Sequence, residues 1–179
     1  IDNGMYEHRI PFSKPADFTV IEFFESQLSN GTLTSSISTA GDWGVTEADF
    51  FTAPSSLTDS PLGNYEDQLW NGTFLYFTTP FSLSGVEHAN LVFHTKYFIE
   101  AEYDVAVVRA STDGINYQAL CGTLSKAPSS NQAPFEEGPI YDGEVSEWTK
   151  EIMCLDEFAG EETVYLQFGI YSDFSVRDD

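Results

Sequence analysis

Residues 91–111 contain two consecutive segments whose apolar side chains follow the two-residue period of a β-strand. In the first segment one face consists of alternate residues: Leu91, Phe93, Thr95, Tyr97 and Ile99. The second segment, from Tyr103 to Ser111, is apolar on both faces, which predicts a central strand between two layers. Thr112-Asp113-Gly114-Ile115-Asn116 follows and predicts a hairpin turn in which glycine supplies the positive φ.

The rest of the chain continues this pattern. Further apolar or alternating runs occupy residues 18–24, 73–77, 117–121, 148–155 and 164–171, and no window has the 3.6-residue stripe of an amphipathic helix. Aromatic residues make up 15% of the chain, and their flat rings favour a pleated surface. The sequence therefore predicts an all-β, antiparallel two-sheet sandwich of about eight strands. Its core should include Leu91, Phe93, Tyr97, Val105, Val107, Leu166 and Phe168.

The length of the chain and the positions of its prolines predict a single domain. A chain of 179 residues suffices for one sizeable core. Residues 1–16, with Pro11 and Pro15, are interpreted as a lead-in or linker, and residues 17–179 as one β-sandwich domain. Residues 125–146 hold three prolines and little periodicity, which predicts a long loop.

The charge balance is strongly acidic, with 29 Asp and Glu against 7 Lys and Arg and a formal net charge of −22. Such a surface repels nucleic-acid phosphates and anionic lipids, so neither is an expected partner. No apolar stretch is long enough to insert into a membrane. The start of the chain lacks the features of a signal peptide, so the domain is either cytosolic or an exported domain whose signal has been removed. The acidity indicates adaptation to salt or solubility, a divalent cation site, or both.

The two cysteines, Cys121 and Cys154, are too few for a disulfide framework or a thiolate zinc site. Both lie at the ends of apolar alternating runs. They are either two buried small hydrophobic residues or one disulfide bridge, and no spacing rule decides between these.

Catalytic motifs are missing from the sequence. His8, His88 and His94 do not have the spacing of a zinc hydrolase, and there is no GxSxG elbow. A glycosidase needs two carboxylates across a groove, and with 29 acids some pair will meet that distance by accident. We therefore expect a domain without catalytic residues of its own.

Two strings of residues are specific enough to indicate a family. Residues 56–65 read SLTDSPLGNY, and residues 99–104 read IEAEYD. In their order with Phe24-Glu25, Trp43-Gly44, Trp148 and the final Asp178-Asp179, they resemble the MAM-like jelly-roll module of immune inhibitor A metallopeptidases and other bacterial secreted peptidases. The resemblance covers about residues 18–179.

This resemblance implies a calcium-binding jelly roll on a secreted or cell-surface protein. The module would be an accessory or adhesion domain that stabilises or positions the catalytic domain of the same polypeptide. In this family the final Asp-Asp pair precedes one more strand, so the domain is expected to lack its last strand here. A carbohydrate-binding module of a secreted polysaccharide-degrading enzyme is the alternative, with an extracellular protein or glycan as partner.

Calcium prefers six to eight oxygen ligands, which loops at strand ends supply. The expected ligands are Glu25 at the end of the first strand, Asp59 and Asn64 in the turn-rich loop, and the terminal pair Asp178 and Asp179. Glu100 and Asp104 rank second, because their places next to strands allow a purely structural role.

Three aromatic residues fall in expected loops: Trp70, Phe135 and Tyr141. They can contact a sugar or a protein ligand, or they can fill the ends of the core, which is the commoner place for a large apolar ring.

Overall fold

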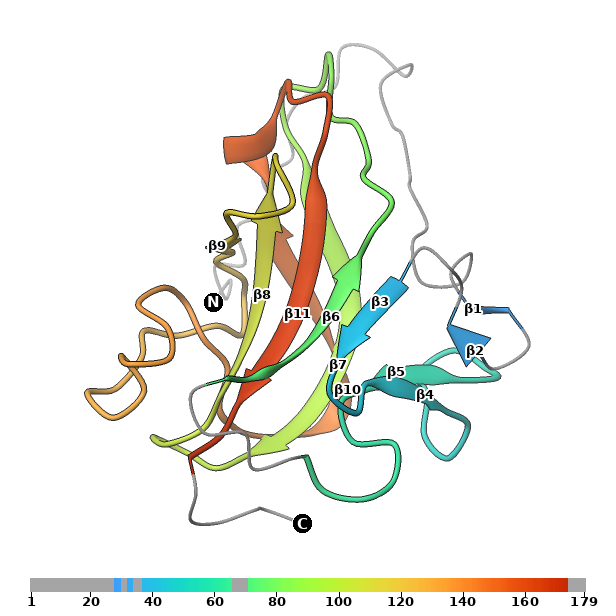
Figure 1. Ribbon diagram of the computed structural model, residues 1–179, viewed down its shortest axis with the longest axis vertical. Coiled ribbons are helices and arrows are strands. Elements are labelled where there is room, and N and C mark those ends of the chain that lie inside the picture. Colours follow the sequence, from blue (N-terminus) through green and yellow to red (C-terminus); the bar gives the residue numbers. More distant parts are fainter. Residues whose placement is uncertain (1–27, 30–31, 34–36, 66–70, 174–179) are drawn as a thin grey trace, which may run out of the picture.

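The computed structural model describes residues 28–29, 32–33, 37–65 and 71–173 (Figure 1). These residues form strands and one 3₁₀ turn, but no α-helix. The elements are β1 (Leu28–Ser29), β2 (Thr32–Leu33), β3 (Ile37–Ala40), β4 (Gly44–Thr46), β5 (Ser56–Thr58), β6 (Thr73–Phe77), β7 (Asn90–Ile99), β8 (Val105–Ser111), β9 (Gln118–Ala119), β10 (Gly143–Cys154), η1 (Asp156–Phe158) and β11 (Tyr165–Tyr171).

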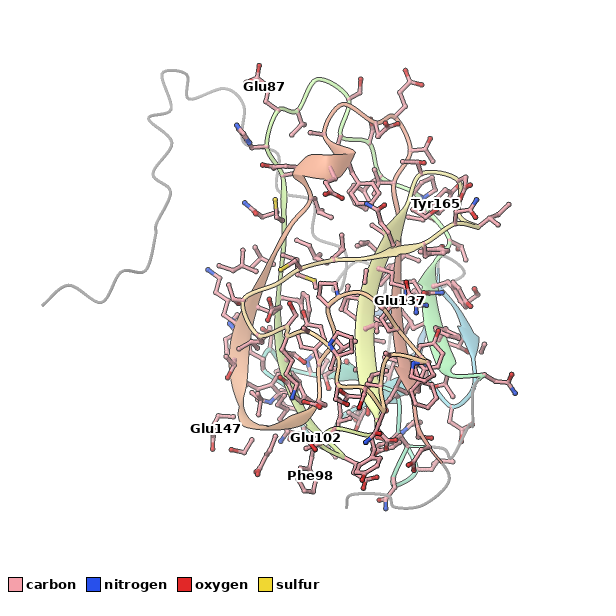
Figure 2. The ribbon with its side chains drawn as sticks, turned by 90° about the vertical axis from the view of Figure 1, so that its left-hand side faces the viewer. Glu87, Phe98, Glu102, Glu137, Glu147 and Tyr165 are labelled. Atoms are coloured by element: carbon pink, nitrogen blue, oxygen red, sulfur yellow. The ribbon has the colours of Figure 1, made fainter. Side chains whose placement is uncertain are left out.

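Two layers of antiparallel strands build the fold. The larger sheet has the order β3-β6-β11-β8-β9, and β7 pairs with β10 in the second layer. Figure 2 shows these layers edge-on, with β10 on one side and the five-stranded sheet on the other. Small two-stranded sheets, β1-β2 and β4-β5, lie beside them. The prediction of an all-β, antiparallel fold is confirmed.

The core lies between the two layers. Leu75 of β6, Leu166 of β11 and Met153 of β10 are at most 1% exposed and belong to the same apolar cluster. Burying an aliphatic side chain of this size stabilises the folded state by about 1.5–3 kcal/mol. The alternation seen in the sequence therefore places one face of each of these three strands in the apolar cluster.

Strand β8 is covered on both faces, as its sequence predicts. Val108 and Ala110 face the core between the layers. Val105 and Val107 point the other way and are buried by Ile140. The residues that cover this outer face belong to the long loop between β9 and β10, so the loop is a packed part of the domain.

The predicted core is only partly buried at one side. Leu91, Val105, Val107 and Leu166 are buried, whereas Phe93, Tyr97 and Phe168 are half-buried. The reason is a cavity of about 1010 Å³ between the layers, next to the β4-β5 hairpin, which these three side chains line.

Some boundaries differ from the sequence-based prediction. Strand β10 begins at Gly143, five residues before the expected start, and an irregularity between Val145 and Thr149 interrupts its register with β7. Strand β3 lies in a segment whose serine and threonine content predicts a loop, and it forms an edge beside β6. The predicted strand at residues 18–24 lies outside the described residues. Among those described, no helix has the length and apolar character needed to cross a membrane.

Candidate metal site

Three carboxylate side chains meet at one end of the two layers. Glu100 follows β7, Asp104 precedes β8, and Asp173 lies two residues after β11. Strands β8 and β11 are antiparallel neighbours with Val105 opposite Tyr171, so their flanking residues meet at the same end (Figure 1). One oxygen from each of the three side chains lies within 4.8 Å of the others. We call these three residues the carboxylate cluster.

Asp104 is the centre of the cluster and is fully buried. The Tyr65 hydroxyl donates to its Oδ2 over 2.6 Å, and the Asp173 backbone N–H donates to its Oδ1 over 2.7 Å. The Asp104 N–H in turn donates to the Glu100 carbonyl over 3.1 Å, which closes the turn between β7 and β8. One side chain thus links that turn, the end of β11 and the end of the 56–65 loop.

A second layer of contacts holds the turn from the side of the long loop. Gln132 is fully buried, and its Nε2 donates to the Asp104 carbonyl over 2.9 Å and to Asp142 Oδ2 over 2.6 Å. The same Asp142 oxygen accepts the Glu102 N–H over 2.9 Å. Because Glu102 has a φ of 69°, this hydrogen bond supports a left-handed residue that carries a side chain.

Asp142 is the charged anchor of these contacts. Burial alone would raise the pKa of its carboxyl, but hydrogen bonds from Lys126, Glu102 and Gln132 outweigh burial and lower the pKa. Lys126 forms an ion pair with the other Asp142 oxygen. The carboxylate is therefore ionised at neutral pH, and it ties the long loop to the cluster.

The cluster offers hard oxygen atoms in a fixed arrangement. Three carboxylates this close repel one another unless a proton or a cation compensates their charge. Calcium accepts carboxylate oxygens at 2.3–2.6 Å in flexible geometries, whereas magnesium requires a tighter octahedron. The arrangement can therefore hold a divalent cation, with calcium the better match.

The structure describes two of the five expected ligands, Asp59 and Asn64. Glu25, Asp178 and Asp179 lie outside the described residues. Asp59 is not a member of the carboxylate cluster, and it accepts a hydrogen bond from Ser60 Oγ over 3.4 Å. Burial raises the pKa of the Asp59 carboxyl, and the hydrogen bonds from its own N–H and from Ser60 only partly oppose this. Asn64 is exposed, but the next residue is Tyr65, which reaches Asp104.

Glu100 and Asp104, ranked second from the sequence, form the cluster, and Asp59 does not belong to it. Asp173 was not predicted. Asp173 follows the strongly apolar strand β11. Pairing β11 with β8 in the sequence-based prediction would have placed Asp173 beside Asp104.

The structure describes two of the three loop aromatics. Tyr141 is only 4% exposed, and its ring packs edge-on against Tyr97 with centroids 5.9 Å apart, so it fills the core instead of facing a ligand. Phe135 is half-buried and packs against Tyr171 on the outer side of β8. Trp70 lies outside the described residues.

A second surface with ligand-binding chemistry covers the outer face of the five-stranded sheet. Tyr76, Gln167 and Arg109 stand opposite one another across β6, β11 and β8. The Arg109 guanidinium donates to Gln167 Oε1 over 3.2 Å and to the Tyr171 hydroxyl over 3.0 Å. Half-buried rings of the described residues lie on this face beside them, and we call the following set the outer aromatic surface: Phe74, Tyr76, Tyr117, Tyr165 and Tyr171. Figure 2 shows Tyr165 on the five-stranded side.

Comparison with known proteins adds no relative to this description: no protein-family model matches the chain, and no curated protein matches it.

Proposed function

We propose that the chain is a non-catalytic, calcium-binding accessory module of a secreted peptidase, built as a jelly roll. The observation that carries this proposal is the meeting of two sequence strings at one site. The 56–65 string ends in Tyr65, whose hydroxyl donates to Asp104 over 2.6 Å. The 99–104 string supplies both Glu100 and Asp104 to the carboxylate cluster. These are the strings on which the resemblance to the MAM-like modules rests.

The path of the chain supports the jelly-roll part of the proposal. Strands β6, β8, β9 and β11 belong to the larger sheet, while β7 and β10 belong to the other layer. The chain therefore crosses repeatedly between the layers instead of completing one sheet first. Crossovers of this kind are typical of jelly rolls, in which two Greek keys fold into a double sheet.

The net charge supports the calcium part. A chain of charge −22 loses self-repulsion when it binds a divalent cation. Calcium at the carboxylate cluster would also link the β7–β8 turn to the end of β11. Binding to the folded state alone adds RT ln(1 + [L]/Kd) to its stability, about 2.7 kcal/mol at a hundredfold excess.

The test compares thermal unfolding with millimolar calcium and with chelator. Calcium should raise Tm by roughly 5–10 °C. Glu100→Gln and Asp173→Asn should each remove most of this rise, because they delete one charged ligand while keeping side-chain size. Magnesium should have a smaller effect than calcium.

Two variants control the experiment. Glu102→Gln alters an exposed acid of the same turn, and it should retain the full calcium response. Asp59→Asn should also retain it, since Asp59 is outside the carboxylate cluster. Equal Tm values of the unmodified chain in calcium and in chelator would reject the calcium site.

The outer aromatic surface favours a second candidate function, a carbohydrate-binding module. Tyrosine rings beside fixed polar groups combine an apolar face with hydrogen-bonding partners, which suits a neutral glycan. The test is retardation of the chain in native gels that contain neutral polysaccharides. Tyr76→Ala should abolish retardation, and Phe98→Ala, an aromatic residue 46% exposed on the other layer, should not. Unretarded wild-type chain in every gel would leave the accessory module as the only candidate.

A further inference from the structure

Cys121 and Cys154 stand directly opposite each other on neighbouring segments. Gly122 forms an antiparallel bridge with Met153. On one side of this bridge the Thr123 N–H donates to the Ile152 carbonyl over 3.1 Å, and on the other the Cys154 N–H donates to the Cys121 carbonyl over 3.4 Å. The register therefore pairs residue 121 with residue 154.

Burial places the two thiols on the same outer surface. Leu120 and Met153 are buried in the core, at 4% and 0% exposure. Because side chains alternate along paired strands, the next residue of each segment, Cys121 or Cys154, points outward. Both cysteines are exposed, and both thiols are free. The alternative of two buried small hydrophobic residues is thereby excluded.

Opposed residues of an antiparallel pair have the Cα spacing of a disulfide. Hydrogen-bonded pairs have a Cα separation of about 5.5 Å. Disulfides span Cα separations of about 4.4–6.8 Å and Cβ separations of about 3.5–4.5 Å, so the bond needs side-chain rotation and a small approach of the two segments. The Ser125 hydroxyl donates to Cys121 Sγ over 3.9 Å, and this weak contact is easily exchanged.

We propose that Cys121 and Cys154 form a reversible surface disulfide when the domain meets a disulfide oxidant, such as oxidised glutathione or a protein disulfide. The thiolate of one cysteine attacks a sulfur of the oxidant and releases one thiol. The second cysteine then attacks the mixed disulfide, which forms the intramolecular S–S bond and releases the second thiol. The two cysteines together lose two protons and two electrons, and the oxidant is reduced to two thiols.

The bond would enclose the segment that supports the carboxylate cluster. Residues 122–153 include Gln132 and Asp142, whose hydrogen bonds hold the turn before β8. Closing this segment restricts the unfolded chain more than the folded one, so it favours the folded state. The inference depends only on register and exposure, and it is independent of the proposed calcium site.

The test treats the folded, reduced chain with oxidised glutathione in the presence of chelator. Mass spectrometry should find the loss of two hydrogen atoms per chain and a peptide pair that joins Cys121 to Cys154. Tm should rise by roughly 5–10 °C, and dithiothreitol should reverse both changes. Cys121→Ser and Cys154→Ser, each close in size to cysteine, should show no rise.

The wild-type measurements decide the proposal even if a serine variant folds poorly. Glutathione attached to both cysteines without an internal bond would overturn it. A disulfide between two chains would also overturn it, and an internal bond without any gain in Tm would overturn the stabilising effect.

Discussion

Two fully buried carboxylates at different positions of the sandwich, Glu151 and Asp104, have opposite surroundings. Glu151 lies near the end of β10, and its carboxylate accepts the Thr123 and Leu124 N–H groups and the Thr123 hydroxyl. Asp104 accepts two hydrogen bonds but also lies within 4.8 Å of two other carboxylates. Donors surround the first acid, whereas the second shares its site with other acids.

The comparison teaches that burial alone does not identify a functional acid. A carboxylate whose oxygens accept hydrogen bonds from backbone N–H groups has satisfied polar atoms and a structural role. Glu151 holds the segment after β9 against the sheet, and Gly122 permits this contact because a Cβ there would lie 2.1 Å from Glu151 Oε1. A carboxylate among carboxylates needs a cation or a proton, and so it marks a candidate site.

The largest effect should come from removing the structural acid. Glu151→Ala removes a fully buried side chain and leaves the partly buried Thr123 and Leu124 N–H groups without their acceptor, which should cost about 2–4 kcal/mol in the free energy of unfolding. Urea denaturation measures it. Glu144→Ala, an exposed acid of the same strand, should change stability by no more than about 0.5 kcal/mol. Similar losses for both variants would contradict the distinction.

A smaller effect is expected in the calcium response, which should distinguish variants of Glu151 from variants of the carboxylate cluster. Glu151 pairs with Phe93, six residues along β7 from Ile99, which is roughly 20 Å from the carboxylate cluster. Calcium at a hundredfold excess should therefore add about 2.7 kcal/mol to the milder variant Glu151→Gln as it does to the wild type. In Glu100→Gln the addition should be largely lost. Loss of the calcium response in Glu151→Gln would mean that the two acids are coupled.

The smallest effect on stability is expected at Asp113, an exposed acid that accepts backbone N–H hydrogen bonds as Glu151 does. Asp113 accepts the Asn116 and Ile115 N–H groups, the Asn116 amide and the Ser111 hydroxyl. The Asn116 hydrogen bonds come first among these in holding the pKa of Asp113 far below its usual range. A depressed pKa stabilises the fold above the unfolded-state pKa of about 3.9, and this contribution is lost as pH falls below that value.

An NMR titration of the Asp113 carboxyl measures its pKa and so tests this prediction. Asn116→Ala should raise the pKa toward its ordinary value, and Glu102→Gln should not change it. Asp113→Ala should destabilise the domain less than Glu151→Ala, because water can replace the lost acceptor at an exposed turn. An ordinary pKa for Asp113 in the wild type would contradict the hydrogen-bonded turn.

Much of the fold could be predicted because its signals are local. The period of two in residues 73–77, 91–99 and 164–171 matches β6, β7 and β11 closely. The apolar character of residues 103–111 on both faces predicts the double burial of β8. The edge strand β3 was missed, because a polar strand at the edge of a sheet has the composition of a loop.

The candidate site was harder to predict, since its members come from distant parts of the chain. Asp104 and Asp173 are 69 residues apart, and they meet through the pairing of β8 with β11. Turn formers surround Asp59 in the sequence, which predicts a ligand loop, yet its carboxylate accepts a hydrogen bond from the adjacent Ser60 within the same turn. Turn composition identifies where a chain can bend, but not what the bend will face.

By itself, the sequence determined the strand class, the acidic surface and most strand positions, because hydrophobic period and net charge are properties of short windows and of composition. The tertiary structure alone decided which acids converge, which acids are surrounded by hydrogen-bond donors, and that Cys121 faces Cys154. The physical reason is that register and sheet order depend on packing between segments far apart in the chain. Hydrogen-bond partners and distances of a few ångströms follow only from that packing.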